Sequence, residues 1–206
     1  METANLNLVS MRGAEQMRAV AENRLRIIKG GLSIFRKRGA HFTMDDLAKE
    51  ISMSKKTIYM VFSDKEELLL AMVDFVFDEI EKEEEKALKD EGLSTVERFR
   101  RILGAMPSTY IGFDFSGIIG NDSRYPNVLK RMNERLETGW ERTFSVLKQG
   151  IEEGVFRPVD FTVFKLIYSA ALERFLNSKE LKANGIKYMD AFSSLVELLI
   201  DGLSVR

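Results

Sequence analysis

Apolar residues recur at every third or fourth position along nearly the whole 206-residue chain, and this spacing most constrains its fold. Residues three and four apart share one face of an α-helix, whereas a half-buried strand would alternate apolar with polar residues, a pattern that is scarce here. The three prolines, Pro107, Pro126 and Pro158, lie outside the periodic segments. One clear stripe consists of Leu25, Ile28, Leu32 and Phe35. The sequence therefore predicts an all-α protein of about nine helices.

Polar residues suited to capping precede several of these helices. Ser63 with Glu66, and Ser94 with Glu97, have the spacing of a capping box, in which a hydroxyl and a carboxylate each bond a free backbone amide. Asp160 precedes another apolar stripe and is expected to cap it.

A longer helical pattern occupies the second half of the chain. Pro126 suits a first helical turn, and apolar residues then continue at helical spacing over 128–151. Gly154 is expected to end this segment. Residues 112–125, which include three glycines, give mixed signals. The last helix has two apolar stripes, so we expect it to be buried on more than one side.

The composition excludes several classes of protein. Without cysteine the chain has no disulfide or thiol nucleophile, and the single histidine, His41, rules out sites built from two or more histidines. We therefore expect no metal and no cofactor. No apolar run approaches the roughly 20 residues that span a bilayer, and the N-terminus lacks the pattern of a secretion signal. These observations predict a soluble cytoplasmic protein without a membrane partner.

The formal net charge of −1 hides an uneven distribution. Residues 11–62 hold 11 Lys and Arg against 5 Asp and Glu, a net charge of +6. Residues 63–92 hold 4 against 12, a net charge of −8, and residues 93–206 carry +2. The basic segment points to an anionic partner, although a solvated surface accounts for it equally well. The run from Asp78 to Glu91 is most simply a solvated helix face with Glu–Lys pairs.

Residues 43–68 hold the most informative pattern in the chain. Two short helices are predicted, at roughly 44–51 and 54–61, with so few residues between them that only a tight corner fits. Thr43 and Ser54 are suited to cap them. Two short helices joined by a short turn form a helix-turn-helix, whose second helix enters the major groove of DNA.

Three polar residues open the second of these helices: Lys55, Lys56 and Thr57. In a helix-turn-helix these first positions face the base edges. Lysine can bond guanine acceptors or phosphates, and threonine can bond a phosphate or contact a thymine methyl. The pattern therefore favours double-stranded DNA as the partner.

The same segment resembles the DNA-binding region of the TetR family of transcriptional regulators. That family shows a Gly, then a Thr that opens a helix containing Leu-Ala, then Ser-x-x-Thr-hydrophobe-Tyr-x-x-Phe and Lys-Glu-x-Leu. The matching residues are Gly39, Thr43, Leu47, Ala48, Ser54, Thr57, Ile58, Tyr59, Phe62, Lys65, Glu66 and Leu68. The motif covers roughly a quarter of the chain, and the phrase at 153–157 resembles a turn common in the family's C-terminal domains.

The resemblance implies two domains. A three-helix helix-turn-helix domain is expected at 20–80, with the motif at 43–62, after an N-terminal extension at 1–19 that need not be fully ordered. The C-terminal domain, 81–206, is expected to be helical, to bind an effector and to form a homodimer through its last two long helices.

The resemblance and the positions within the motif also assign site residues. The expected DNA contacts are Thr43, Ser54, Lys55, Lys56, Thr57, Tyr59 and Lys65, of which Lys56 is assigned from its position in the second helix. The candidates for the ligand pocket are Met106, Tyr110, Phe113, Trp140, Phe144, Tyr168 and Phe175. The candidates for the dimer interface are Phe164, Tyr168, Phe175, Phe192, Val196 and Leu199. An ordinary helical core would account for most of these aromatic residues.

Three features depart from the family pattern. Ser52 stands where many members have a glycine, so it is expected to adopt a positive φ at a cost of about 1 kcal/mol. Lys56 replaces another common glycine and adds a positive charge. The pair Gly30–Gly31 lies inside a predicted helix at a cost of roughly 1–2 kcal/mol, which close packing of another helix would explain.

The sequence thus predicts a dimeric TetR-like regulator, a repressor that a small apolar or amphipathic ligand releases from a palindromic operator. One alternative is a helical adaptor that uses the helix-turn-helix to bind protein. An all-α enzyme is less favoured, because the sequence shows no pairing of a nucleophile with a base.

Overall fold

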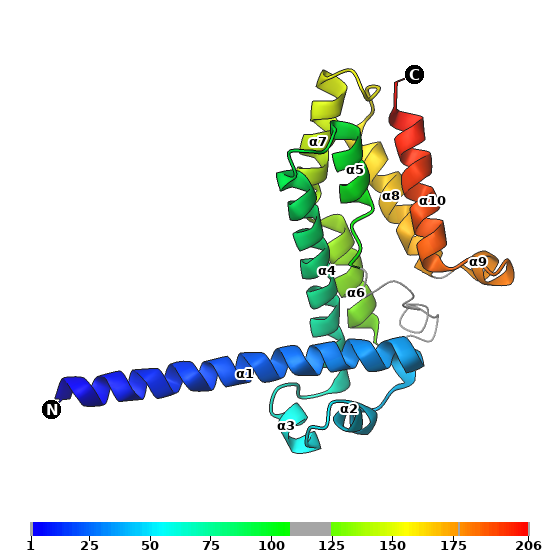
Figure 1. Ribbon diagram of the computed structural model, residues 1–206. Coiled ribbons are helices and arrows are strands. Elements are labelled where there is room, and N and C mark those ends of the chain that lie inside the picture. Colours follow the sequence, from blue (N-terminus) through cyan, green and yellow to red (C-terminus); the bar gives the residue numbers. More distant parts are fainter. Residues whose placement is uncertain (1, 108–124, 177, 206) are drawn as a thin grey trace. The chain divides into compact units, whose positions relative to one another are not determined.

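The computed structural model describes residues 2–107, 125–176 and 178–205. In this part of the chain the regular elements are helices (Figure 1). The extended pairing is one isolated bridge between Phe156 and Ser204. The predicted all-α fold is therefore confirmed.

The chain divides into two compact units, residues 1–72 and 73–206. The division falls within α4 (Lys65–Lys89), whereas the sequence places it further along that helix, after residue 80. Residues 2–19, expected to form an extension, are part of α1. The N-terminal unit contains α1 (Glu2–Arg38), the 3₁₀ turn η1 (Gly39–His41), α2 (Met44–Glu50), α3 (Lys55–Tyr59) and the start of α4.

The N-terminal unit is built around a small core. Helix α1 packs on α2 and η1, and α2 packs on α3 (Figure 1). Leu25 belongs to the predicted stripe of α1 but is 41% exposed, because the buried face of the helix begins at Ile27. The most buried side chains are Ile27, Phe35, Phe42, Leu47, Ile58, Phe62, Leu68 and Leu69.

The corner between α2 and α3 follows the sequence prediction closely. Thr43 accepts a hydrogen bond from the Asp46 amide, and Ser54 accepts one from the Thr57 amide, so both expected caps are confirmed. Ser52, between the helices, has a φ of +50°, which confirms the positive φ expected at this position. The turn therefore holds an L-residue in the left-handed region that favours glycine.

Close packing explains the glycines inside α1. A Cβ on Gly30 would lie 2.0 Å from the Cγ2 of Ile51, which directly follows α2. A Cβ on Gly31 would lie 2.8 Å from the Sδ of Met72 on α4. Only a glycine at Gly30 lets α2 approach α1 this closely, since the Ile51 methyl is a branch next to the backbone and cannot move away alone.

The start of α4 differs from the predicted capping box by one residue. The Glu67 amide donates to the Asp64 carboxylate, and the Ser63 amide and hydroxyl both donate to the Glu67 carboxylate. The capping acceptor is therefore Asp64 rather than Ser63, and the reciprocal carboxylate is Glu67 rather than Glu66. An aspartate beside a serine offers the stronger, charged acceptor.

In its described part the C-terminal unit contains the rest of α4, five further helices of 9–16 residues and one short helix. Ser94 and Asp160 accept hydrogen bonds from the Glu97 and Val163 amides, as expected of caps. The remaining helices are α5 (Thr95–Leu103), α6 (Pro126–Glu137), α7 (Trp140–Glu152), α8 (Phe161–Leu176), α9 (Lys179–Ala183) and α10 (Tyr188–Leu203).

The long helix predicted over 128–151 is in fact two helices. The chain breaks between α6 and α7 at Thr138 and Gly139, and Gly139 has a φ of +80°. The apolar residues keep a helical period across the break because both helices bury an apolar face in the same unit. The prediction of one continuous helix from this period was therefore wrong. Gly154, also at positive φ, follows the end of α7 as expected.

Helix α5 packs on α7 and α10, and α8 packs on α10 (Figure 1). Their shared core is apolar and rich in phenylalanine; it includes Phe99, Ile102, Leu103, Leu147, Phe156, Phe164, Leu172, Phe192, Val196 and Ile200. Within the described residues no helix is long and apolar enough to cross a membrane.

Candidate functional sites

Helix α3 presents a polar, basic face. Ile58 is fully buried and fixes the helix in the core, while Lys55, Lys56 and Tyr59 are exposed. The next residue, Met60, is 78% exposed, so the end of this short helix also faces outward. Two cationic side chains and a tyrosine hydroxyl on one small surface can bond phosphates and base edges.

The two lysines of this face differ in their surroundings. The Lys55 ammonium lies 2.7 Å from the Asp45 carboxylate, and this hydrogen bond raises the pKa of the lysine. For Lys56 no ion pair occurs among the described residues. A phosphate approaching Lys55 would have to compete with Asp45, whereas one approaching Lys56 would not. Lys56 is therefore the better placed of the two to bind an anion.

The three hydroxyl residues of the expected site hold the local structure. Thr43 and Asp46 form a reciprocal capping box, and the hydrogen bonds from the Thr43 backbone and hydroxyl lower the pKa of the Asp46 carboxyl. The Ser54 and Thr57 hydroxyls lie 2.7 Å apart in a hydrogen bond. Each hydroxyl is still outside the core, so a phosphate can share it.

Lys65 has partners within its own unit. Its ammonium donates to the carbonyls of Ala40 and Phe42 and lies 4.3 Å from the centre of the Phe42 ring. The side chain therefore ties the start of α4 to the turn that precedes α2. Sequence reasoning expected a phosphate contact here and had no signal for these bonds, because carbonyl acceptors more than 20 residues away leave no mark in the local pattern.

A cavity of about 140 Å³ lies in the C-terminal unit. It is lined by α4, α5, α6, α7, α8 and α10 and by Met106. Three of the predicted pocket residues line it: Met106, Trp140 and Tyr168. A cavity of this size can hold a group as large as a benzene ring.

The other pocket candidates lie elsewhere. Phe144 stacks on Phe161 at 5.2 Å between ring centres and is not part of the lining, and Phe175 is half-buried outside it. Tyr110 and Phe113 lie outside the described residues. Phe144 follows Trp140 by four residues, and the centres of the two rings lie 5.6 Å apart. It packs against the apolar core of the unit instead of lining the cavity.

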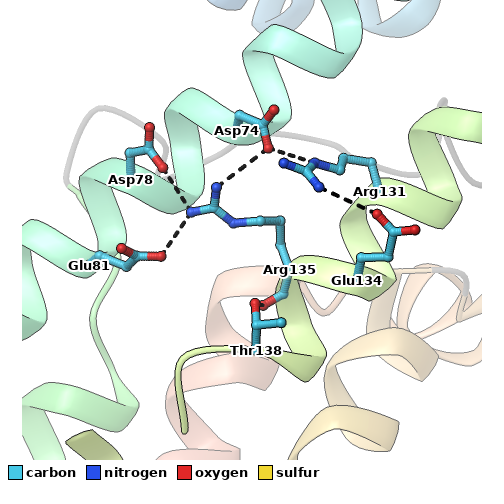
Figure 2. A network of polar contacts seen from close by, with 7 residues as sticks. All are labelled: Asp74, Asp78, Glu81, Arg131, Glu134, Arg135 and Thr138. Atoms are coloured by element: carbon cyan, nitrogen blue, oxygen red, sulfur yellow. Dashed lines mark hydrogen bonds and ion pairs between the residues drawn. The ribbon is translucent and has the colours of Figure 1, made fainter. Parts of the chain in front are cut away.

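Acidic residues of α4 hold two arginines of α6 (Figure 2). The Arg135 Nη2 lies 2.8 Å from the Asp78 carboxylate and 2.9 Å from that of Glu81, and its Nη1 lies 3.4 Å from Asp74. The Arg131 Nε lies 2.8 Å from the same Asp74 oxygen. Arg135 also lines the cavity. The acidic run predicted as a solvated face is thus in part a binding surface for α6.

Glu84 is a second polar group of the cavity that sequence reasoning missed. Glu84 lines the cavity, and desolvation raises the pKa of its carboxyl to about 7; Arg142 lowers this pKa and Glu81 raises it further. Nothing in the sequence pattern marked this position, because Glu84 lies in a run of glutamates whose pattern is typical of a solvated helix face.

The predicted interface residues lie mostly inside the protomer. Phe164, Phe192 and Val196 are buried in its own core, Tyr168 lines the cavity, and Phe175 and Leu199 are half-buried. A partner chain could not reach the first three, so their assignment is corrected. The apolar residues that α8 and α10 leave exposed are instead Val163, Leu166, Ile167 and Leu198.

Among the described residues no cluster of His, Cys, Asp and Glu is arranged to hold a metal ion.

The sequence comparisons match bacterial transcriptional regulators. Residues 27–72 match the family model for bacterial regulatory proteins of the tetR family. The uncharacterized HTH-type transcriptional regulator YvaF of Bacillus subtilis (strain 168) is 20% identical over 182 residues, which cover 87% of this chain and 94% of that protein.

Solved structures share the fold. The transcriptional regulator FadR from Bacillus subtilis, in complex with stearoyl-CoA, is 18% identical with a TM-score of 0.59 and covers 86% of this chain and 98% of its own. A putative TetR-family regulator from Syntrophomonas wolfei str. Goettingen is 22% identical with a TM-score of 0.61 and covers 90% and 98%. The TetR family regulator PfmR from Thermus thermophilus is 23% identical with a TM-score of 0.56 and covers 88% and 97%.

Proposed function

We propose that this chain is a member of the TetR family of bacterial regulatory proteins and acts as a homodimeric repressor. It binds a palindromic DNA operator and leaves it when a small lipophilic ligand occupies the C-terminal unit. The observation that carries the DNA-binding part is the exposed face of α3. Lys55, Lys56 and Tyr59 point outward from a helix that Ile58 anchors in the core.

The expected DNA contacts divide into two groups. Lys56 and Tyr59 are exposed side chains that can reach bases or phosphates, and Lys55 can do so in competition with Asp45, while Thr43, Ser54 and Thr57 also build the caps. Lys65 contributes indirectly, since its bonds to the turn before α2 fix the position of the motif.

The proposed response to a ligand uses α4. This helix begins in the N-terminal unit, and its Asp74, Asp78 and Glu81 are held by Arg135, which also lines the cavity. A ligand that displaces Arg135 would change the hold of α6 on α4 and favour a tilt of that helix. A hundredfold loss of operator affinity needs about 2.7 kcal/mol of coupling, which requires the ligand to bind one state better than the other.

Selection from a random pool of DNA duplexes tests the operator proposal. A homodimer with two recognition helices should enrich a two-fold symmetric sequence with half-sites about one helical turn apart. An enriched sequence without symmetry would contradict the dimeric mode of binding. If no sequence is enriched, the helical adaptor becomes the better account.

Replacing Lys56 with alanine should weaken binding to the selected duplex. Each protomer of the proposed dimer should lose one phosphate contact, so the slope of log K against log salt should shrink by about two units. Lys55→Ala should have a smaller effect, because Asp45 already pairs with that lysine. Fluorescence anisotropy at several salt concentrations measures both.

Lys148→Ala removes the same charge from the C-terminal unit and serves as the control. It should leave the affinity and the salt slope unchanged. Equal slopes for Lys56→Ala and the unaltered protein would show that Lys56 does not contact DNA.

A further inference from the structure

Among the described residues, one charged group that lines the cavity of the C-terminal unit has no ion-pair partner. The charged residues of this described lining are Glu81, Glu84 and Arg135. Glu81 is paired with Arg135 at 2.9 Å. For Glu84 no ion pair and no hydrogen bond occurs among the described residues, although Arg142 attracts it. Within the described lining, the ionisable group without an ion-pair partner is therefore an acid.

Several hydrogen-bond donors of the described lining are already engaged, whereas the Thr143 hydroxyl, which also lines the cavity, has no hydrogen bond within the described residues. The Arg135 guanidinium bonds three carboxylates. The Trp140 indole N–H donates to the Leu136 carbonyl at 2.9 Å, and the Tyr168 hydroxyl donates to the Leu103 carbonyl at 2.6 Å. A carboxylate or phosphate entering the cavity could accept a hydrogen bond from the neutral Thr143 hydroxyl, but it would compete with these bonds for the other donors and would also meet the charge of Glu84.

The rest of the lining suits an apolar body with a positive charge. Aromatic rings from four helices border the cavity: Phe77, Trp140, Tyr168, Tyr188 and Phe192. Aromatic faces attract cations as well as apolar groups, and the attraction grows where water is excluded. A half-buried carboxylate without a counter-ion is also costly to keep charged, which an incoming cation would relieve.

We propose that the effector of this protein is a lipophilic cation, an ammonium or similar group on an apolar body, whose charge pairs with Glu84 inside the cavity. The proposal rests on the proposed function only in that the ligand of this cavity is taken to be the effector. A lipophilic cation differs from a fatty-acid or acyl-phosphate ligand, because the charge of those ligands is negative.

Three probes with the same apolar body and different head groups test it: 4-phenylbutyltrimethylammonium, 4-phenylbutanol and 4-phenylbutanoate. Trp140 is the single tryptophan of the chain and lines the cavity, so its fluorescence reports binding directly. At pH 8 the full-length protein should bind the cation at least tenfold more tightly than the alcohol or the anion.

Glu84→Gln should weaken binding of the cation at least tenfold and change binding of the alcohol less than threefold. Glu85→Gln is the matched control, since Glu85 follows directly in α4, pairs with Lys89 and does not line the cavity. It should change neither affinity more than threefold. Thermal unfolding by circular dichroism checks that both variants are folded.

The affinity for the permanent cation should rise about tenfold between pH 6 and pH 8. Over this range Glu84, with a pKa of about 7, loses its proton and gains the charge that the cation needs. The groups that face it from the surrounding helices are Glu81 of α4, Arg135 of α6, Arg142 of α7, Tyr168 of α8 and Tyr188 of α10. The arginines stay charged, burial raises the pKa of both tyrosines, and Glu81 remains paired with Arg135. Glu84 is therefore the group whose charge changes over this range, and the pH dependence of cation binding should vanish in Glu84→Gln.

Three outcomes would overturn the proposal: an anion that binds as tightly as the cation, a cation affinity that Glu84→Gln leaves intact, or no binding of any probe up to millimolar concentration. The selected DNA duplex is tested with the same preparations without probe. Retained DNA binding together with any of these outcomes rejects the cationic effector alone, whereas lost DNA binding in the unaltered protein rejects the regulator itself.

Discussion

Ser52 holds the one positive φ of a non-glycine residue found in the described part of the chain. In this region the Cβ of an L-residue approaches the backbone carbonyl, which costs roughly 1 kcal/mol. The turn between α2 and α3 needs this conformation, because only a sharp reversal lets two short helices pack side by side.

Replacing Ser52 with glycine should raise the free energy of unfolding by about 0.5–1 kcal/mol, because glycine adopts a positive φ without the clash while losing more entropy on folding. Urea denaturation at a fixed protein concentration measures the change. Ser52→Ala removes the same hydroxyl but keeps the Cβ, so it should give no gain. Equal stabilisation by both variants would show that the hydroxyl, and not the backbone strain, is responsible.

At the scale of elements, the crossing of α1 and α2 depends on one glycine more than on its neighbour. Gly30→Ala should cost about 1–3 kcal/mol, since its Cβ would overlap the Ile51 methyl at 2.0 Å. Gly31→Ala meets only the movable Met72 sulfur at 2.8 Å, and the gain in helix propensity is up to about 1 kcal/mol. Gly31→Ala should therefore be neutral or stabilising in thermal unfolding. If both variants lost a similar amount of stability, the close approach of α2 at Gly30 would not explain the difference expected between them.

The junction of α4 and α6 depends on the more buried of two arginines. Arg135 is 15% exposed and holds three carboxylates, whereas Arg131 is 39% exposed and shares Asp74 (Figure 2). Arg135→Gln should cost about 1–3 kcal/mol of stability, because it leaves three carboxylates close together without their cation, and Arg131→Gln less than about 1 kcal/mol.

Urea denaturation compares these two variants, and a ligand titration on operator DNA shows whether the junction carries the response. In Arg135→Gln the ligand should release less DNA than in Arg131→Gln at equal occupancy of the cavity. An unchanged response in both would place the coupling of ligand to DNA elsewhere in the C-terminal unit.

At the scale of the whole molecule, the proposed homodimer requires an exposed apolar surface. Helix α8 provides one, since Val163, Leu166 and Ile167 lie at spacings of three and four residues and are all about half exposed. Leu198 of α10 is 72% exposed. A contiguous apolar face on a helix that already packs on its neighbour is typical of a surface that binds a partner chain.

Ile167→Glu should convert the dimer to a monomer at micromolar concentration, because a dimer would bury the added charge without a partner. Light scattering coupled to size exclusion measures the mass. Ile186→Glu is the matched control: Ile186 is 44% exposed against 51% for Ile167 but lies outside both long helices. A dimer that survives Ile167→Glu, or dissociates in both variants, would place the interface on another face.

The local part of this protein could be predicted from the sequence by itself. The caps at Thr43 and Ser54, the strained turn at Ser52 and the two short helices all arise from residues within a few positions of each other, where helical geometry and hydrogen bonding leave few alternatives. The family motif lies in the same local segment, which is why the DNA-binding function was accessible without coordinates.

Only the tertiary structure decided what the acidic run of α4 and the apolar faces of α8 and α10 do. An acidic run has the same appearance in the sequence whether water or α6 covers it, and Asp78 of this run meets Arg135 across 57 residues of chain. In the same way Phe164 and Val196 share an apolar stripe with residues that a partner could reach, but they face the core of their own protomer. Helical periodicity specifies which residues share a face; the packing of the other helices determines whether that face meets the core, a cavity or solvent.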